Sequence, residues 1–186
     1  MRRIKVTRSF IIFWILVLFV DTEGVSLVFL IAAAFHEFGH LMAIYLCGGK
    51  VMQIRLNATG GEIRYYLPRK TKIRESCIAL SGCTFGFILS VTAFLSGMVM
   101  LCGASTILTC FNLLPISFLD GGRALGIIWE DCAVLLWIEC FTIGLLFLCG
   151  IMFVYMWNAY GVLLAAVLLV FLQQSLLRRR KNKGMI

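Results

Sequence analysis

The sequence is poor in charge, in proline and in histidine. Charged residues make up 14% of the chain, hydrophobic residues make up 61%, and there are two prolines and two histidines. A soluble domain contains about 45–50% apolar and about 25% charged residues, so this composition excludes an ordinary soluble protein. None of the eight cysteines forms a CxxC pair, and most lie within apolar runs, so no disulfide framework is predicted.

The hydrophobic residues lie in long runs, and runs of about 20 apolar residues are typical of membrane-spanning helices. We therefore predict an all-α polytopic membrane protein in which residues 1–186 form a single membrane-embedded domain. Six transmembrane helices are expected, at about 9–20, 25–47, 76–96, 98–118, 132–150 and 155–177. The first can extend back towards Ile4, and it is expected to be retained because no small-residue cleavage site follows it.

The seventeen basic residues test this arrangement, because basic residues gather on the cytoplasmic side of membrane proteins. They occur before the first segment, between the second and third, between the fourth and fifth, and after the sixth. Six crossings put all of these patches on one side, so both termini are predicted to be cytoplasmic. We therefore interpret the net charge of +8 as the result of basic residues on the cytoplasmic side of a lipid bilayer, and no nucleic-acid partner is expected.

The stretch from 48 to 75 is the only sizeable hydrophilic connection. Residues that favour strands, from Val51 to Tyr66, flank Gly60-Gly61, which predicts a small β-hairpin.

The two histidines occur together, as His36-Glu37-Phe38-Gly39-His40 in the second apolar segment. Helical positions i and i+4 share a face about 5–6 Å apart, so both imidazoles can bind one metal ion, and Glu37 can take a proton from an attacking water. The alternative is a pair of hydrogen-bonded core histidines. Three ionisable side chains within five residues of a membrane segment are costly in hydrocarbon, which favours a metal site.

A catalytic zinc needs a third protein ligand and an open position for water. Asp21 and Glu23 lie on the opposite side by the charge pattern, and Glu62 and Glu75 belong to the basic loop. Asp120 ends the fourth segment on the side where the helix carrying the histidines also ends. Topology therefore favours Asp120, and the alternative is an interfacial aspartate paired with Arg123.

The segment before Asp120 is unusual for a membrane helix, because it contains Pro115 and is followed by Gly121-Gly122. These residues should unwind the backbone, and irregular backbone at membrane depth is tolerated only when it is buried in protein or lines a wet cavity. Hydrolysis within a membrane requires such a cavity to admit water.

The combination of HExxH at His36–His40 with Asn112-Leu113-Leu114-Pro115 and Leu119-Asp120-Gly121 resembles the site-2 protease family of intramembrane zinc metalloproteases. The family patterns are HExxH and NxxPxxxxDG, and the resemblance extends over about residues 9–125. It implies that His36, His40 and Asp120 ligate one Zn²⁺ per chain and that Glu37 is the catalytic base.

The resemblance also implies that Asn112 holds the substrate backbone or the developing oxyanion. It implies that the hairpin at Gly60 and Gly61 is associated with the membrane, as in the family, and presents an edge to an unwound substrate. The implied substrate is a membrane-tethered protein, such as a transcription-factor precursor, cut in or near its transmembrane segment. The chain looks most like the compact sporulation-type branch, including the stage IV sporulation protease, which implies regulated intramembrane proteolysis in a bacterial plasma membrane.

One departure from the family pattern concerns the start of the third helix. A Gly-Pro pair is frequent there in the family, whereas this chain has Ser81-Gly82-Cys83. This departure affects the expected regulation and substrate more than the expected chemistry.

Two further alternatives follow from the residues. Glu139 can line a substrate path, or it can make a polar contact between helices, which the sequence favours. A bundle with histidine and carboxylate side chains can also belong to a metal transporter or a metal-binding membrane protein without hydrolysis. A transporter, however, has no need of a glutamate between its two ligands.

Overall fold

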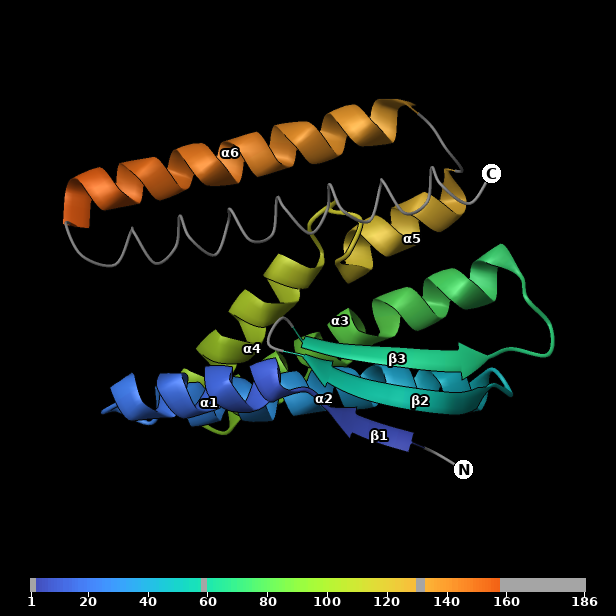
Figure 1. Cartoon of the computed structure of the whole chain (residues 1–186), viewed down its shortest axis with the longest axis horizontal. Helices are drawn as coiled ribbons and strands as arrows, with labels where there is room; N and C mark the ends of the chain where they lie inside the picture. The colour runs from blue at the N-terminus through green and yellow to red at the C-terminus, as the bar shows by residue number, and fades with distance from the viewer. Residues whose placement is uncertain (1–2, 58–59, 130–132, 158–186) are drawn as a thin grey trace. The chain divides into compact units, whose positions relative to one another are not determined.

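The computed structural model describes residues 3–57, 60–129 and 133–157. The chain divides into two compact units, Met1–Leu113 and Leu114–Ile186. Helices and one small sheet make up the first unit, and the described part of the second contains a loop followed by two helices (Figure 1). The expectation of one membrane-embedded domain over residues 1–186 stays a prediction.

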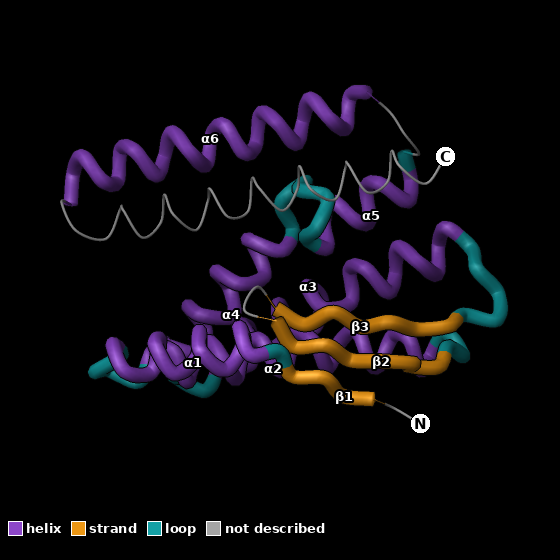
Figure 2. The backbone as a smooth tube through the Cα atoms, in the orientation of Figure 1, coloured by secondary structure: helices purple, strands orange, loops and turns teal. Residues whose placement is uncertain are grey.

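The first unit contains strand β1 (Arg3–Val6) and helices α1 (Arg8–Val20) and α2 (Val25–Leu46). Strands β2 (Lys50–Asn57) and β3 (Gly60–Tyr66) and helices α3 (Lys72–Leu95) and α4 (Val99–Asn112) follow. The second unit contains α5 (Asp120–Ile128) and α6 (Ala133–Trp157). Figure 2 shows the three strands side by side.

The sheet has the order β1-β2-β3. The predicted hairpin is present, with β2 and β3 antiparallel and Leu56 opposite Gly61. The expected extension of the first helix towards Ile4 is wrong, because Ile4 lies in β1 and pairs in parallel with Ile54. Thr7 ends the strand and caps α1, since its hydroxyl oxygen accepts from the Phe10 amide at 3.3 Å.

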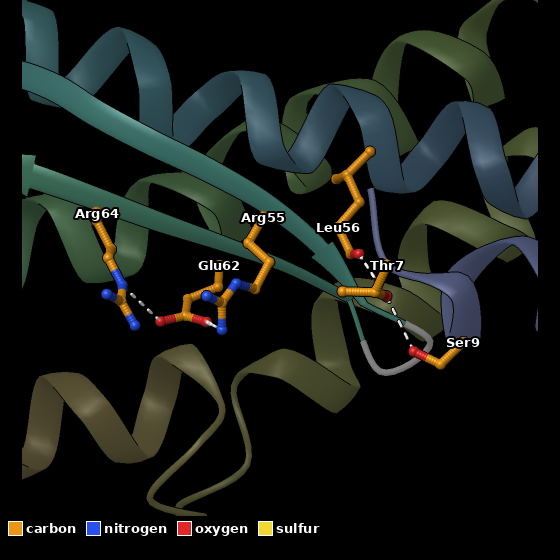
Figure 3. A network of polar contacts seen from close by, with 6 residues as sticks. All are labelled: Thr7, Ser9, Arg55, Leu56, Glu62 and Arg64. Carbon is orange, nitrogen blue, oxygen red and sulfur yellow. Dashed lines mark hydrogen bonds and ion pairs between the residues drawn. The ribbon is translucent and has the colours of Figure 1, made fainter. Parts of the chain in front are cut away.

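Polar contacts fasten the sheet to the helix that follows β1 (Figure 3). The Thr7 hydroxyl donates to the Leu56 carbonyl at 2.9 Å, which joins the start of α1 to β2. On the strands, the Glu62 carboxylate lies between Arg64, 3.1 Å away, and Arg55, 4.0 Å away. These side chains are half exposed, so each ion pair contributes little to stability, and the backbone ladder holds the hairpin.

Asp21 connects α1 to α2. Its carboxylate accepts from the Val25 amide at 3.1 Å and the Ser26 amide at 2.7 Å, and also from the Ser26 hydroxyl. The Ser26 contacts, first its hydroxyl and then its amide, hold the pKa of Asp21 below its ordinary value of 3.8. Gly24, with φ at +73°, makes the left-handed turn that starts α2.

The packing of α2 against α3 is close beside the two histidines. A Cβ on Gly39 would lie 2.7 Å from the Ser81 carbonyl oxygen and 2.8 Å from Phe85 Cβ, so glycine is needed for this approach. Where the two helices meet the sheet, Ile44, Leu67 and Ile78 form a buried cluster. The hairpin is thereby held against α2, which carries both histidines, and against α3.

The helices differ from the prediction at three places. The segment expected at 98–118 is helical only to Asn112, and a loop with Pro115 follows, because proline removes a backbone donor and disfavours helix at the residue before it. Helix α5 was not predicted. Helix α6 runs to Trp157, beyond the end expected at 150, and the rest of the sixth segment lies outside the described residues.

Two of the described helices, α2 and α3, are long and apolar enough to cross a membrane by length and composition. Helix α1 has 13 residues and α4 has 14, which is short for a span. Six spans are therefore not established by the lengths of the helices. Large apolar side chains are nevertheless exposed along α1, including Ile15, Leu16 and Phe19, and no residue of α1 is buried.

Candidate metal centre

Helix α2 places both histidines on one buried face. His36 and His40 are 5% and 7% exposed. Their rings meet edge to face with centroids 5.0 Å apart, and their Nε2 atoms are 3.3 Å apart. The sequence predicted that a spacing of four residues would put both imidazoles on one face of the helix, and the structure has them there.

The distance between the two nitrogens fits a zinc ion. Zinc binds histidine nitrogen at about 2.0–2.1 Å with tetrahedral geometry, so two nitrogens that share one ion lie about 3.3–3.4 Å apart. The observed 3.3 Å between His36 Nε2 and His40 Nε2 agrees with this value. The separation of the two nitrogens therefore fits a shared zinc ion.

Gly82 on α3 keeps the space beside these nitrogens open. A Cβ at residue 82 would lie 2.3 Å from His40 Nε2 and 2.6 Å from His36 Nε2. These distances are close to those between zinc and a histidine nitrogen, so the side chain of any other residue would start where the ion fits. The glycine and the histidines together form a cradle of the right size for a metal ion.

A backbone contact determines which ring nitrogen of His40 can bind the ion. His40 Nδ1 lies 2.8 Å from the Ile78 carbonyl oxygen, which can only accept. Nδ1 must therefore carry the hydrogen and donate it, and the lone pair of the neutral ring is on Nε2. In proteins, the ring nitrogen of a histidine that does not bind the metal commonly donates a hydrogen bond in this way, which orients the ring and fixes its tautomer.

Glu37 lies next to His36 in α2, and strand β3 passes directly over its carboxylate. A Cβ on Gly61 would lie 2.8 Å from Glu37 Cδ and 2.9 Å and 3.0 Å from the two carboxylate oxygens. A side chain at residue 61 would therefore displace the end of the Glu37 side chain from its present position. The sequence predicted that Gly60 and Gly61 present a substrate edge; the structure adds a contact between Gly61 and Glu37.

Asp120 is the first residue of α5 in the second unit, and it is buried. Arg123 Nη1 lies 3.9 Å from Asp120 Oδ1, one turn along the same helix. The pairing with Arg123 that the sequence left open is therefore present, at the long limit of an ion pair. The ligand role of Asp120 stays a prediction.

Asn112, at the end of α4, is partly buried, and its side-chain amide donates to the Leu108 carbonyl at 2.9 Å. The expected contact of Asn112 with a substrate stays a prediction. Gly60 opens β3 with φ at +127°, a backbone angle that favours glycine.

Sequence reasoning missed two neighbours of the histidines. Gly82 was noted only as part of an altered Gly-Pro pair, and no pattern in the sequence places it beside the histidines. Cys83 was interpreted as a packing thiol, yet its Sγ lies within 4.8 Å of a ring nitrogen of His36, and the residue is 4% exposed.

Comparisons with known proteins agree with this geometry. The family model for peptidase family M50 matches residues 24–103, a stretch that includes α2, the hairpin and α3. No curated protein sequence matches the chain significantly. Among solved structures, the site-2 protease from Methanocaldococcus jannaschii is similar, with a TM-score of 0.63 and 20% sequence identity over 94% of this chain and 89% of that one. The chain therefore has a fold similar to that of a site-2 protease, and its segment with the histidines matches a peptidase family.

Proposed function

We propose that this protein is a membrane zinc metalloprotease of the site-2 protease type, with His36, His40 and Asp120 as ligands of one zinc and Glu37 as the base. The observation that carries the proposal is the 3.3 Å separation of His36 Nε2 and His40 Nε2 beside the cradle left by Gly82. The match of residues 24–103 to peptidase family M50 supports hydrolysis of a peptide bond as the reaction.

Membrane insertion is supported by the apolar helices. Helix α2 has 22 residues, or about 33 Å, which matches the ~30 Å hydrocarbon core of a bilayer. Helix α1 has 13 residues, or about 20 Å, and the Arg3 and Lys5 side chains of β1 before it belong to the basic patch that we expect on the cytoplasmic side. We propose six crossings with both termini in the cytoplasm.

The chemistry follows from the residues around the cradle. Zinc, when bound, would polarise the scissile carbonyl and lower the pKa of an attacking water. Glu37 takes the proton from that water and delivers it to the leaving nitrogen, so that a C–O bond forms as the C–N bond breaks. Gly61 keeps the backbone of β3 against the Glu37 carboxylate and so limits the directions in which the base can turn.

The proposed substrate is a membrane-tethered protein, cut in or near its transmembrane segment. Strand β3 lies at one edge of the sheet, and an unwound substrate segment can pair with such an edge. Because β3 passes over Glu37, a strand added there would lie near the base. A transcription-factor precursor processed by regulated intramembrane proteolysis, as in a sporulation pathway of a bacterium, is the substrate type we propose.

The test is co-expression with candidate membrane-tethered substrates, comparing the wild-type protein with Glu37→Gln. Wild type should cleave, and Glu37→Gln should lose cleavage while it keeps bound zinc, because the base is lost and the ligands remain. Cleavage by the variant would contradict the role of Glu37. Bound zinc without cleavage of any substrate, together with metal flux into vesicles, would favour a transporter instead.

A further inference from the structure

Helix α6 buries one position along the part whose side chains the structure describes, residues 134–149, and that position is a glutamate. Glu139 is 4% exposed, whereas Trp137 and Phe141 on either side of it are 77% and 72% exposed. A helix in a soluble protein would bury its aromatic residues and expose its carboxylate. The buried carboxylate therefore has a specific partner.

The partner of Glu139 is the loop between α4 and α5. Glu139 Oε1 accepts from the Ser117 hydroxyl at 2.8 Å and from the Ser117 amide at 3.2 Å. Both bonds go to one residue, and one of them goes to its backbone. The carboxylate thus fixes the direction of the chain at Ser117 and not only the rotamer of a side chain.

The first turn of α5 also packs against this loop, at Ile116. A Cβ on Gly122 would lie 2.1 Å from the Ile116 carbonyl oxygen, so the loop backbone rests directly on Gly122. Within the loop, the Leu119 amide donates to the Ile116 carbonyl at 2.8 Å. Residues 116–119 are therefore enclosed between α5 and Glu139, and Asp120 follows immediately.

We propose that Glu139 is a positioning residue for the metal site, acting through its two hydrogen bonds to Ser117 to hold the loop that orients the Asp120 carboxylate. This role rests on the proposed function, because it assumes that Asp120 binds the metal. Ser117 is three residues before Asp120, so a loop released from α6 changes the direction in which α5 begins. Metal ligands in proteins depend on such supporting bonds, and loss of one lowers metal affinity by about ten- to a hundredfold.

The experiment compares Glu139→Ala and Glu139→Gln in the full-length protein in detergent. A glutamine oxygen can accept both bonds from Ser117, so Glu139→Gln should behave like wild type. Glu139→Ala should lower zinc affinity by about ten- to a hundredfold and alter the visible spectrum of bound Co²⁺, which reports the ligand geometry. Thr142→Ala is the matched control on α6, because among the described residues the Thr142 hydroxyl bonds within the helix, to the Ile138 carbonyl at 2.8 Å.

Two further measurements separate the positioning role of Glu139 from the proposed function of the protein. Asp120→Asn should change the Co²⁺ spectrum; if it does not, Asp120 is not a ligand and the proposed ligand set is wrong. Hydrogen exchange of the Ser117 amide in metal-free protein decides the positioning role by itself, and Glu139→Ala should accelerate it while Glu139→Gln should not. Unchanged exchange in Glu139→Ala, or an equal defect in both variants, would overturn the inference. Ser117→Ala loses the hydroxyl bond to Glu139 and keeps the amide bond, so its zinc affinity should lie between that of wild type and that of Glu139→Ala.

Discussion

Replacement of Gly82 by alanine tests the metal cradle most directly. The added methyl carbon would lie 2.3 Å from His40 Nε2 and 2.6 Å from His36 Nε2, where ordinary contact needs about 3.5 Å or more. At least one imidazole must then move by roughly 1 Å, since the methyl stands at the place of the ion. His40 resists this movement, because its Nδ1 is bonded to the Ile78 carbonyl at 2.8 Å.

The expected result of Gly82→Ala is a loss of zinc affinity of about a hundredfold or more. Loss of a bond that supports one ligand costs about ten- to a hundredfold, and this change displaces a ligand and fills the ion's position. The strain of overpacking should add about 1–3 kcal/mol of destabilisation. Zinc content after dialysis against buffered free zinc, measured by atomic absorption, checks the affinity.

The control for Gly82→Ala is Gly103→Ala on α4, where an added Cβ meets no atom within 4 Å. Both changes place alanine in a helix, so they share any effect of helix propensity. Gly103→Ala should retain zinc. Wild-type zinc affinity in Gly82→Ala would refute the reasoning, because two imidazoles cannot share an ion with a methyl group between them.

Further predictions concern the hairpin and the connection between α1 and α2. In Gly61→Ala the new Cβ would lie 2.8 Å from Glu37 Cδ, so the carboxylate should shift and turnover should fall by about ten- to a hundredfold while zinc content stays unchanged; equal turnover would contradict the contact. Asp21 has a lowered pKa in the folded protein, so its stabilisation is present above about pH 3.8 and is lost as the pH falls through the folded value. The difference in Tm between wild type and Asp21→Ala should accordingly be largest near neutral pH and shrink below pH 3.8; a constant difference would contradict the linkage.

The local parts of the site were predictable from the sequence, because they depend on short spacings. The HExxH spacing alone places His36 and His40 on one helix face, and the strand-forming residues around Gly60-Gly61 predict the hairpin. The supporting contacts were not predictable, since they join residues far apart in the chain. Nothing near Gly82 indicates that α3 will press it against two histidines about forty residues earlier.

The end of the fourth helix illustrates a different limit. Pro115 correctly indicated an unwound backbone, but the expectation for Gly121-Gly122 was wrong, because both glycines lie within α5. Hydropathy alone continued the fourth helix to residue 118. The structure ends α4 at Asn112 and starts α5 at Asp120. Likewise, Arg3-Ile4-Lys5-Val6 alternates polar and β-branched residues as a strand does, but four residues are a short signal, and they form a strand where β2 offers an edge to them.

The parallel pairing of β1 with β2 has a consequence for the order in which the protein assembles during synthesis. Arg3 pairs beside Gln53 and Val6 beside Leu56, so β1 leaves the ribosome long before its partner exists. Helices α1 and α2 must emerge and turn back at Asp21–Gly24 before the strands can meet. Strand β1 therefore stays unpaired until β2 has been synthesised. A bulky fusion at Met1 should delay closure of the sheet while leaving formation of the two helices unaffected.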